Sequence, residues 1–293
     1  MMSNTPVLIL HETRDNAWRL LLLGHTFGWL PTQQVAIVEA DFIQQWQSPQ
    51  QGHATITTLK TALVTPTANF ITEAQLSSLH PLVAEQLDHW ILYAANSDAE
   101  GKALLQPVMV LKSAAARFPL PLISLQLATL VNQLMGLPYS WGGLGGLYDC
   151  SSTLVTLFQP FGIWLPRNSG DQARTAQPYL DLTGLDRPQK LALIKQQGVP
   201  FLTLGWLPGH VVLYLGEKQG IPHLFNSLWG FKTVDSTTQQ TGRALIGRSV
   251  IMPLNVDTGY ANIPHTLLDR LQRLIVVTAD NYPLSKQPPQ STQ

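Results

Sequence analysis

Residues 137–161 read LPYSWGGLGGLYDCSSTLVTLFQPF and contain Cys150, the single cysteine of the 293-residue chain. Glycines and polar residues precede the cysteine, and apolar residues at helical spacing follow it. Asp149, Ser151 and Ser152 favour a helix start, because their side-chain oxygens can accept the unpaired N–H groups of a first turn. Gly162 favours the end of the segment. The pattern therefore predicts a helix that carries the thiol in its first turn.

A thiol at a helix start is placed for nucleophilic chemistry. The partial positive charge of the helix end favours thiolate over thiol, so we expect a lowered pKa for Cys150. The alternative is a buried structural cysteine, which is the commoner role of a lone cysteine. A core cysteine does not need glycine and polar flanks, and these flanks favour the nucleophile.

A partner for the thiol lies on a predicted strand. His210 follows Gly209 and begins the apolar run 211–215, which places it where a loop meets a sheet and can face a cleft. A histidine beside a cysteine can pair with the thiolate and later protonate a leaving amine. The alternative is a structural histidine whose ring is satisfied by its neighbours.

A third polar residue must orient the imidazole, and the next strand offers His223 and Asn226. They are three positions apart, so a regular strand points them to opposite faces. The Gly220 turn predicts an antiparallel hairpin, in which the partner of His210 lies near the far end of the second strand. This geometry favours Asn226 over His223.

The composition excludes several classes of protein. The chain has 18 basic and 18 acidic residues, and this zero net charge argues against binding to nucleic acid or to anionic membranes. One cysteine excludes an internal disulfide and a cysteine-rich metal site, and no H-E-x-x-H stretch is present. No apolar run reaches the roughly 18 residues of a transmembrane helix. The first residues lack the basic start and long apolar stretch of a signal peptide. We expect neither a metal nor a cofactor.

The chain divides at Pro119 and Pro121, since prolines restrict the backbone around them. We predict small β domains at 1–60 and 61–117, then a larger domain at 118–293 with a disordered tail from residue 284. Residues 42–60 are interpreted as a connector with one or two strands, 66–87 as an insertion and 165–172 as a polar loop. Strands are predicted at 7–10, 18–23, 35–38, 90–94, 107–111, 200–204, 207–216, 223–226 and 249–254. Helices are predicted from 124, capped by Ser124, from 150, over 187–197 and over 266–275.

Three motifs in this order resemble a known family. The stretches 139–143 (YSWGG), 149–151 (DCS) and 209–216 (GHVVLYLG) are similar to those of the NlpC-type (NlpC/p60) cell-wall cysteine peptidases. The resemblance covers about residues 119–255. It implies an α+β fold, in which a papain-like catalytic domain with a central antiparallel sheet and helices follows two small SH3-like β barrels.

The resemblance also implies an activity and roles for named residues. The activity is hydrolysis of an amide bond in peptidoglycan stem peptides, between D-glutamate and a diamino acid. Cys150 would be the nucleophile and His210 the base, with Asn226 as the orienting residue and Tyr139 stabilising the oxyanion. Substrate-binding candidates are Asp149, for a terminal amine, together with Ser151, Trp141, Arg167 and Ser169. For Asp149, capping of the helix is an equal alternative.

Two features depart from the family's pattern. Ser152 stands where the family has glycine, and the sequence shows no export signal although the family implies the periplasm or cell envelope. Two alternatives stay open beside the peptidase: a catalytically silent wall-binding module, and a papain-like amidase or acyltransferase with another substrate.

Overall fold

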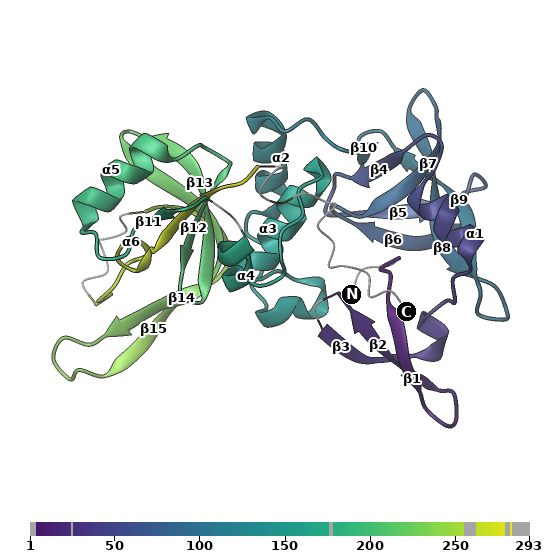
Figure 1. Ribbon diagram of the computed structural model, residues 1–293, viewed down its shortest axis with the longest axis horizontal. Helices are drawn as coiled ribbons and strands as arrows, with labels where there is room; N and C mark the ends of the chain where they lie inside the picture. Colours follow the sequence, from purple (N-terminus) through teal and green to yellow (C-terminus); the bar gives the residue numbers. More distant parts are fainter. Residues whose placement is uncertain (1–3, 25, 176–177, 255–261, 279–281, 283–293) are drawn as a thin grey trace. The chain divides into compact units, whose positions relative to one another are not determined.

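The computed structural model describes residues 4–24, 26–175, 178–254, 262–278 and 282 (Figure 1). The predicted tail from residue 284 lies outside the described residues. The chain forms two compact units, Met1–Leu120 and Pro121–Gln293. We describe each unit by itself.

The first unit begins with a three-stranded antiparallel sheet, made of β1 (Leu8–Glu12), β2 (Trp18–Leu23) and β3 (Thr26–Pro31). The predicted strand at 35–38 is not formed. A short 3-10 helix, η1 (Thr32–Gln34), follows β3, and Ile37 then makes a single bridge to Lys102. Its N–H donates to the Gly101 carbonyl at 2.9 Å, and its carbonyl accepts from the Ala103 N–H at 2.7 Å. These two bonds tie the connector to the second sheet of the unit.

Residues 40–47 form a helix, α1 (Ala40–Gln47), where the sequence predicted a connector. Phe42, Ile43 and Trp46 recur at helical spacing, although none of them is fully buried. The glutamines of this segment interrupt the apolar pattern, which is why the sequence did not predict a helix here. The helix packs against the second sheet, since the Trp46 ring meets the His80 ring edge-on at 6.1 Å.

A seven-stranded antiparallel sheet completes the first unit. Its strands are β4 (His53–Ile56), β5 (Lys60–Val64), β6 (Phe70–Gln75), β7 (Leu79–Glu85), β8 (His89–Ser97), β9 (Ala103–Leu111) and β10 (Ala115–Arg117), in the order β10-β4-β7-β8-β9-β5-β6. The predicted insertion at 66–87 is wrong, because it supplies β6 and β7. The second sheet thus begins at His53, ahead of the domain boundary expected at residue 60. An SH3-like character for the two sheets stays a prediction.

The second unit is built from helices and a six-stranded antiparallel sheet, which confirms the predicted α+β class. Its helices are α2 (Ser124–Leu134), α3 (Cys150–Phe158), α4 (Ser169–Thr175), α5 (Arg187–Gln197) and α6 (Leu267–Arg270), with short 3-10 turns η2 (Trp141–Gly146) and η3 (Gln159–Phe161). Its strands are β11 (Leu180–Asp181), β12 (Thr203–Leu207), β13 (His210–Lys218), β14 (Ile221–Val234), β15 (Thr241–Pro253) and β16 (Arg273–Val276), in the order β11-β16-β12-β13-β14-β15.

Several boundaries in this unit differ from the prediction. The helix expected over 266–275 stops at Arg270, because residues 273–276 pair with β12 as a strand. The polar loop at 165–172 turns into α4 at Ser169. Ser124 does not cap α2, since Ile123 occupies the N-cap position and makes no side-chain bond there. The strand predicted at 200–204 begins at Thr203 and runs to Leu207.

The core of the second unit fixes the position of helix α3. Leu154, Leu157 and Phe158 of α3 are at most 1% exposed. The helix contacts β13 and β14 of the sheet and lies alongside α2 and α4 (Figure 1). A tight turn at Gly209, which has a left-handed φ of 79°, joins β12 to β13. His210 is therefore the first residue of a central strand.

Candidate active site

The local sequence places Cys150 as predicted, at the start of α3. Asp149 is the N-cap, and its Oδ1 accepts the Ser152 backbone N–H at 2.9 Å. The Ser152 hydroxyl accepts the Asp149 backbone N–H at 2.8 Å, which completes a capping box. The serine that replaces the family's glycine thus stabilises the turn that carries the thiol. Cys150 itself is 7% exposed.

The lowered thiol pKa predicted from the helix start is wrong. Burial, with a smaller contribution from the neighbouring Asp149 carboxylate, raises the pKa of Cys150 to about 11. Hydrogen bonds from the Val211 and Ser151 backbone N–H groups, and the charge of Arg167, lower the pKa but do not outweigh burial. The thiol of the substrate-free protein is therefore protonated near neutral pH.

The structure brings His210 to the same place and joins it to Asn226. Nε2–H of His210 donates to Asn226 Oδ1 at 3.2 Å, and both residues are buried. Burial lowers the pKa of His210 to about 4, although the bond to Asn226 raises it. The Val211 N–H that reaches the Cys150 sulfur belongs to the residue after His210, so the start of α3 lies against the start of β13.

His223 is in a different position from Asn226. Its ring Nδ1–H donates to the Ile221 carbonyl at 2.8 Å, at the beginning of β14. The β13–β14 register pairs His223 with Gly216, far along β13 from His210. The two candidates thus separate along the hairpin, and Asn226 is the one that contacts the imidazole.

Tyr139 lies within electrostatic range of Cys150 and packs against two other aromatic side chains. The Tyr139 ring lies 5.4 Å from that of Trp141 and 6.0 Å from that of Trp229. Burial raises the pKa of Tyr139 well above its usual value, and negative charge at Cys150 or Asp149 raises it further. Its hydroxyl therefore stays protonated and can donate a hydrogen bond. Trp229 was not predicted as a site residue, although it follows Asn226 by only three positions.

Arg167 and Asp149 form a nearly buried ion pair, with side chains 16% and 11% exposed. Arg167 Nη1 donates to Asp149 Oδ1 at 3.0 Å, and Nη2 donates to Oδ2 at 2.6 Å. The Ser151 hydroxyl accepts from Arg167 Nη1 at 3.0 Å and donates to Asp149 Oδ1 at 3.2 Å. Burial alone would raise the pKa of Asp149, but the bonds from Arg167 and Ser152 lower it overall. Three of the predicted substrate-binding residues are thus joined in one network.

Ser169 and Trp141 are the remaining predicted substrate-binding residues. Ser169 is the first residue of α4, two positions beyond Arg167, and Trp141 is 65% exposed. Sequence reasoning missed Gln172, which is fully buried and donates through Nε2 to the carbonyls of Ser151 and Pro166, at 3.2 and 2.8 Å. It ties the loop that carries Arg167 to α3. Its position three residues after Ser169, on the inner face of a short helix, was the only available signal.

The geometry defines a class of site: a cysteine at a helix start, a strand histidine and an amide that orients it. Within the described parts of the chain, the structure has no group of three or more His, Cys, Asp or Glu side chains that could hold a metal ion. No helix among those parts is long and apolar enough to cross a membrane.

Comparisons with known proteins agree with this class. Residues 136–241 match the model of the NlpC/P60 family. A solved NlpC/P60 endopeptidase from Photobacterium damselae subsp. piscicida is 27% identical, with a TM-score of 0.80 over 94% of this chain and 64% of that one. An NlpC/P60 family protein from Bacillus cereus, 16% identical, shares the fold with a TM-score of 0.59 over 92% of this chain and 78% of its own.

Two curated relatives match shorter stretches. Both are gamma-D-glutamyl-L-lysine dipeptidyl-peptidases. The one from Bacillus subtilis is 43% identical over 44 residues, and the one from Bacillus cereus is 32% identical over 87 residues. These stretches are 15% and 29% of this chain, and 15% and 24% of the relatives. Residues 136–241 therefore form a domain of the NlpC/P60 type.

Proposed function

We propose that the protein is a cysteine peptidase that hydrolyses an amide bond in peptidoglycan stem peptides, between D-glutamate and a diamino acid. The observation that carries the proposal is the meeting of Cys150 with the start of β13, where His210 is bonded to Asn226. The names of the two curated relatives support the choice of bond. The natural place of action is then the cell envelope.

The mechanism follows from the protonation states. Because Nε2–H of His210 donates to Asn226, Nδ1 is the unprotonated nitrogen that accepts the thiol proton. The sulfur of Cys150 then attacks the carbonyl carbon, the C–N bond breaks, and the imidazolium gives its proton to the leaving amine. Water, deprotonated by the same imidazole, hydrolyses the thioester and restores the thiol. A neutral resting pair makes His210 a general base, and its lowered pKa keeps the imidazole unprotonated at neutral pH.

Two donors are proposed for the oxyanion. The backbone N–H of Cys150 lies at the first position of α3, where helix N–H groups have no partner within the helix. The hydroxyl of Tyr139 is the second donor, and its raised pKa keeps the proton in place. Donors fixed in this way before the reaction stabilise the charge that develops in the transition state.

Asp149 has a proposed role in substrate recognition as well as its role as the helix N-cap. Its Oδ1 already accepts from Ser152, Ser151 and Arg167, whereas Oδ2 accepts from Arg167 alone. A carboxylate has about four acceptor positions, so Oδ2 can accept one further donor, such as a terminal ammonium. The positive charge of Arg167 weakens the attraction between Asp149 and a terminal ammonium. Discrimination between a free and an acetylated amine therefore depends on hydrogen-bond geometry.

A defined peptide tests both the bond and the specificity. L-Ala-γ-D-Glu-L-Lys and its N-acetylated form are incubated with the protein, and the products are identified by mass spectrometry. We expect release of L-lysine from the free peptide, with much slower cleavage of the acetylated one. Equal cleavage of the two peptides contradicts recognition of the terminal amine by Asp149. Failure to cleave either peptide contradicts the proposed substrate.

A further inference from the structure

A cavity of the first unit, Met1–Leu120, lies outside the candidate active site. Its volume is about 440 Å³, within the range of small-molecule sites. It opens between the segment before β1, the connector after η1, helix α1 and the ends of β6, β8 and β9. The backbone bonds of Ile37 to Gly101 and Ala103 fix one wall of the cavity, because they hold the connector to β9.

The lining has no charge. None of the 19 described residues that line the cavity is Asp, Glu, Lys, Arg or His, in a chain with 36 Asp, Glu, Lys and Arg residues. Its polar groups are instead amides and hydroxyls, from Gln33, Gln47, Asn96 and Ser97 among others. Amides and hydroxyls both donate and accept hydrogen bonds. The lining therefore suits a neutral ligand that carries many donors and acceptors.

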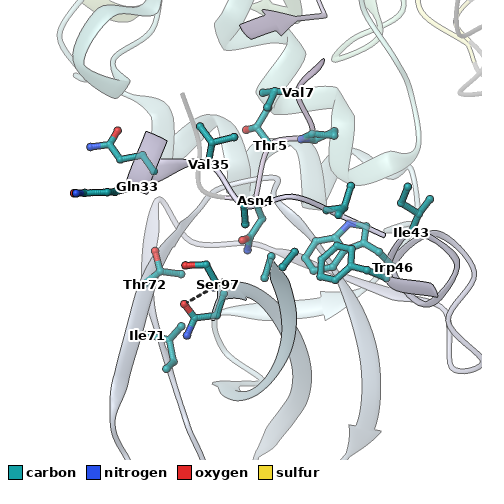
Figure 2. Close-up of a pocket in the computed structure, with 18 of the residues that line it drawn as sticks. Asn4, Thr5, Val7, Gln33, Val35, Ile43, Trp46, Ile71, Thr72 and Ser97 are labelled. Atoms are coloured by element: carbon teal, nitrogen blue, oxygen red, sulfur yellow. Dashed lines mark hydrogen bonds between the residues drawn. The ribbon is translucent and has the colours of Figure 1, made fainter. Parts of the chain in front are cut away.

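Asn4 adds an unmet donor to this lining. Its side-chain Nδ2 is buried and makes no hydrogen bond to any described residue. Figure 2 shows the Asn4 side chain between Trp46 on one side and Thr72 and Ser97 on the other. A buried amide N–H without a partner costs free energy, so a ligand acceptor at this position would be stabilising.

The cavity also has an apolar wall. The rings of Phe42 and Trp46 stack at 5.6 Å with an angle of 10°, and both line the cavity. His53 Nε2–H donates to the Trp46 carbonyl at 2.9 Å, which holds the end of α1 on the sheet. Ile71 and Val35 extend the apolar surface. A ligand that fits has an apolar face or a methyl group as well as its polar groups.

From this combination we propose that the cavity binds a neutral saccharide with an acetamido group, such as an N-acetylhexosamine unit. Hydroxyls of the sugar pair with the amide and hydroxyl lining, and the acetamido carbonyl accepts the N–H of Asn4. The C–H face of the ring and the acetamido methyl pack against the aromatic and aliphatic wall. That the natural ligand is the glycan of the cell wall rests on the proposed function.

The test measures binding of sugars to the full chain by isothermal titration calorimetry. The probes are the β-1,4-linked trimer of N-acetylglucosamine, maltotriose as a neutral sugar without acetamido groups, and a stem tripeptide. We expect the acetylated trimer to bind at least about tenfold more tightly than maltotriose, a difference of about 1.4 kcal/mol. No binding of the trimer, equal affinity for both sugars, or displacement of the trimer by the tripeptide overturns the proposal.

A matched pair of variants locates the binding. Ala95 lines the cavity on β8, so Ala95→Leu fills it, whereas Ala116→Leu adds the same volume on β10 away from the lining. We expect at least about tenfold weaker binding for the first and unchanged binding for the second. Asn4→Ala, which deletes no core side chain, repeats the test if Ala95→Leu is unstable. Unchanged affinity in the cavity variant that folds overturns the proposal.

The test of sugar binding can fail or succeed independently of the test of the proposed peptidase function. Hydrolysis of the glycan-free tripeptide is measured on the same preparations. Sugar binding without hydrolysis contradicts the peptidase alone, and hydrolysis without sugar binding contradicts the saccharide site alone.

Discussion

Replacing Arg167 by leucine should destabilise the second unit strongly. The substitution removes three hydrogen bonds, two to Asp149 and one to Ser151, and leaves a carboxylate with 11% side-chain exposure. Breaking a buried ion pair from one side costs about 3–5 kcal/mol, because the remaining charge is uncompensated. Asp149 keeps its bonds to Ser152 and Ser151, so we expect a loss at the lower end, about 3 kcal/mol.

The single cysteine provides the assay. Cys150 is 7% exposed, so its alkylation at increasing urea concentration reports unfolding of the second unit and gives its free energy. The double variant Arg167→Leu/Asp149→Asn should recover part of the loss, since no buried charge remains. Arg174→Leu is the control, because its pair with Asp171 is exposed and is worth at most about 1 kcal/mol. A loss for Arg167→Leu no larger than for the control, or no recovery in the double variant, refutes the reasoning.

Three further predictions concern the catalytic residues. Tyr139→Phe should lower kcat about a hundredfold with an unchanged melting temperature, because one oxyanion donor is lost; an unchanged rate means that Tyr139 only packs against its aromatic neighbours. Asn226→Ala should reduce turnover well below wild type and His223→Ala should leave it nearly unchanged, and the opposite ranking would contradict the observed contact with His210. Alkylation of native Cys150 should be slower than that of free cysteine at neutral pH and should rise with pH toward its raised pKa of about 11, because the thiolate fraction grows as the thiol loses its proton. A fast rate that is flat across neutral pH would indicate a preformed ion pair instead.

Features that depend on local sequence could be predicted. The capped helix start at Asp149, the strand that begins at His210 and the preference for Asn226 over His223 follow from capping, alternation and hairpin geometry. Each needs only residues that are close in sequence, or two strands joined by one turn. The same holds for α5, whose capping box and apolar spacing lie within its own residues.

Features set by long-range contacts could not be predicted. Residues 273–276 have an apolar pattern that also suits a helix, and only pairing with β12 makes them a strand. The ion pair of Arg167 with Asp149 joins residues from a loop and a helix start that the sequence separates. The pKa of Cys150 was mispredicted for the same reason, because the burial that raises it comes from packing of α3 against the sheet.

The most direct test of the central claim uses purified peptidoglycan and a single substitution. Release of new amino groups is measured for the wild-type protein and for Cys150→Ala, with native folding of both checked by circular dichroism. We predict steady release by the wild type and none by the variant, because the thiol forms the covalent intermediate. Equal release by the two proteins, or no release by the wild type, would contradict the assignment of Cys150 as the nucleophile of a cell-wall peptidase.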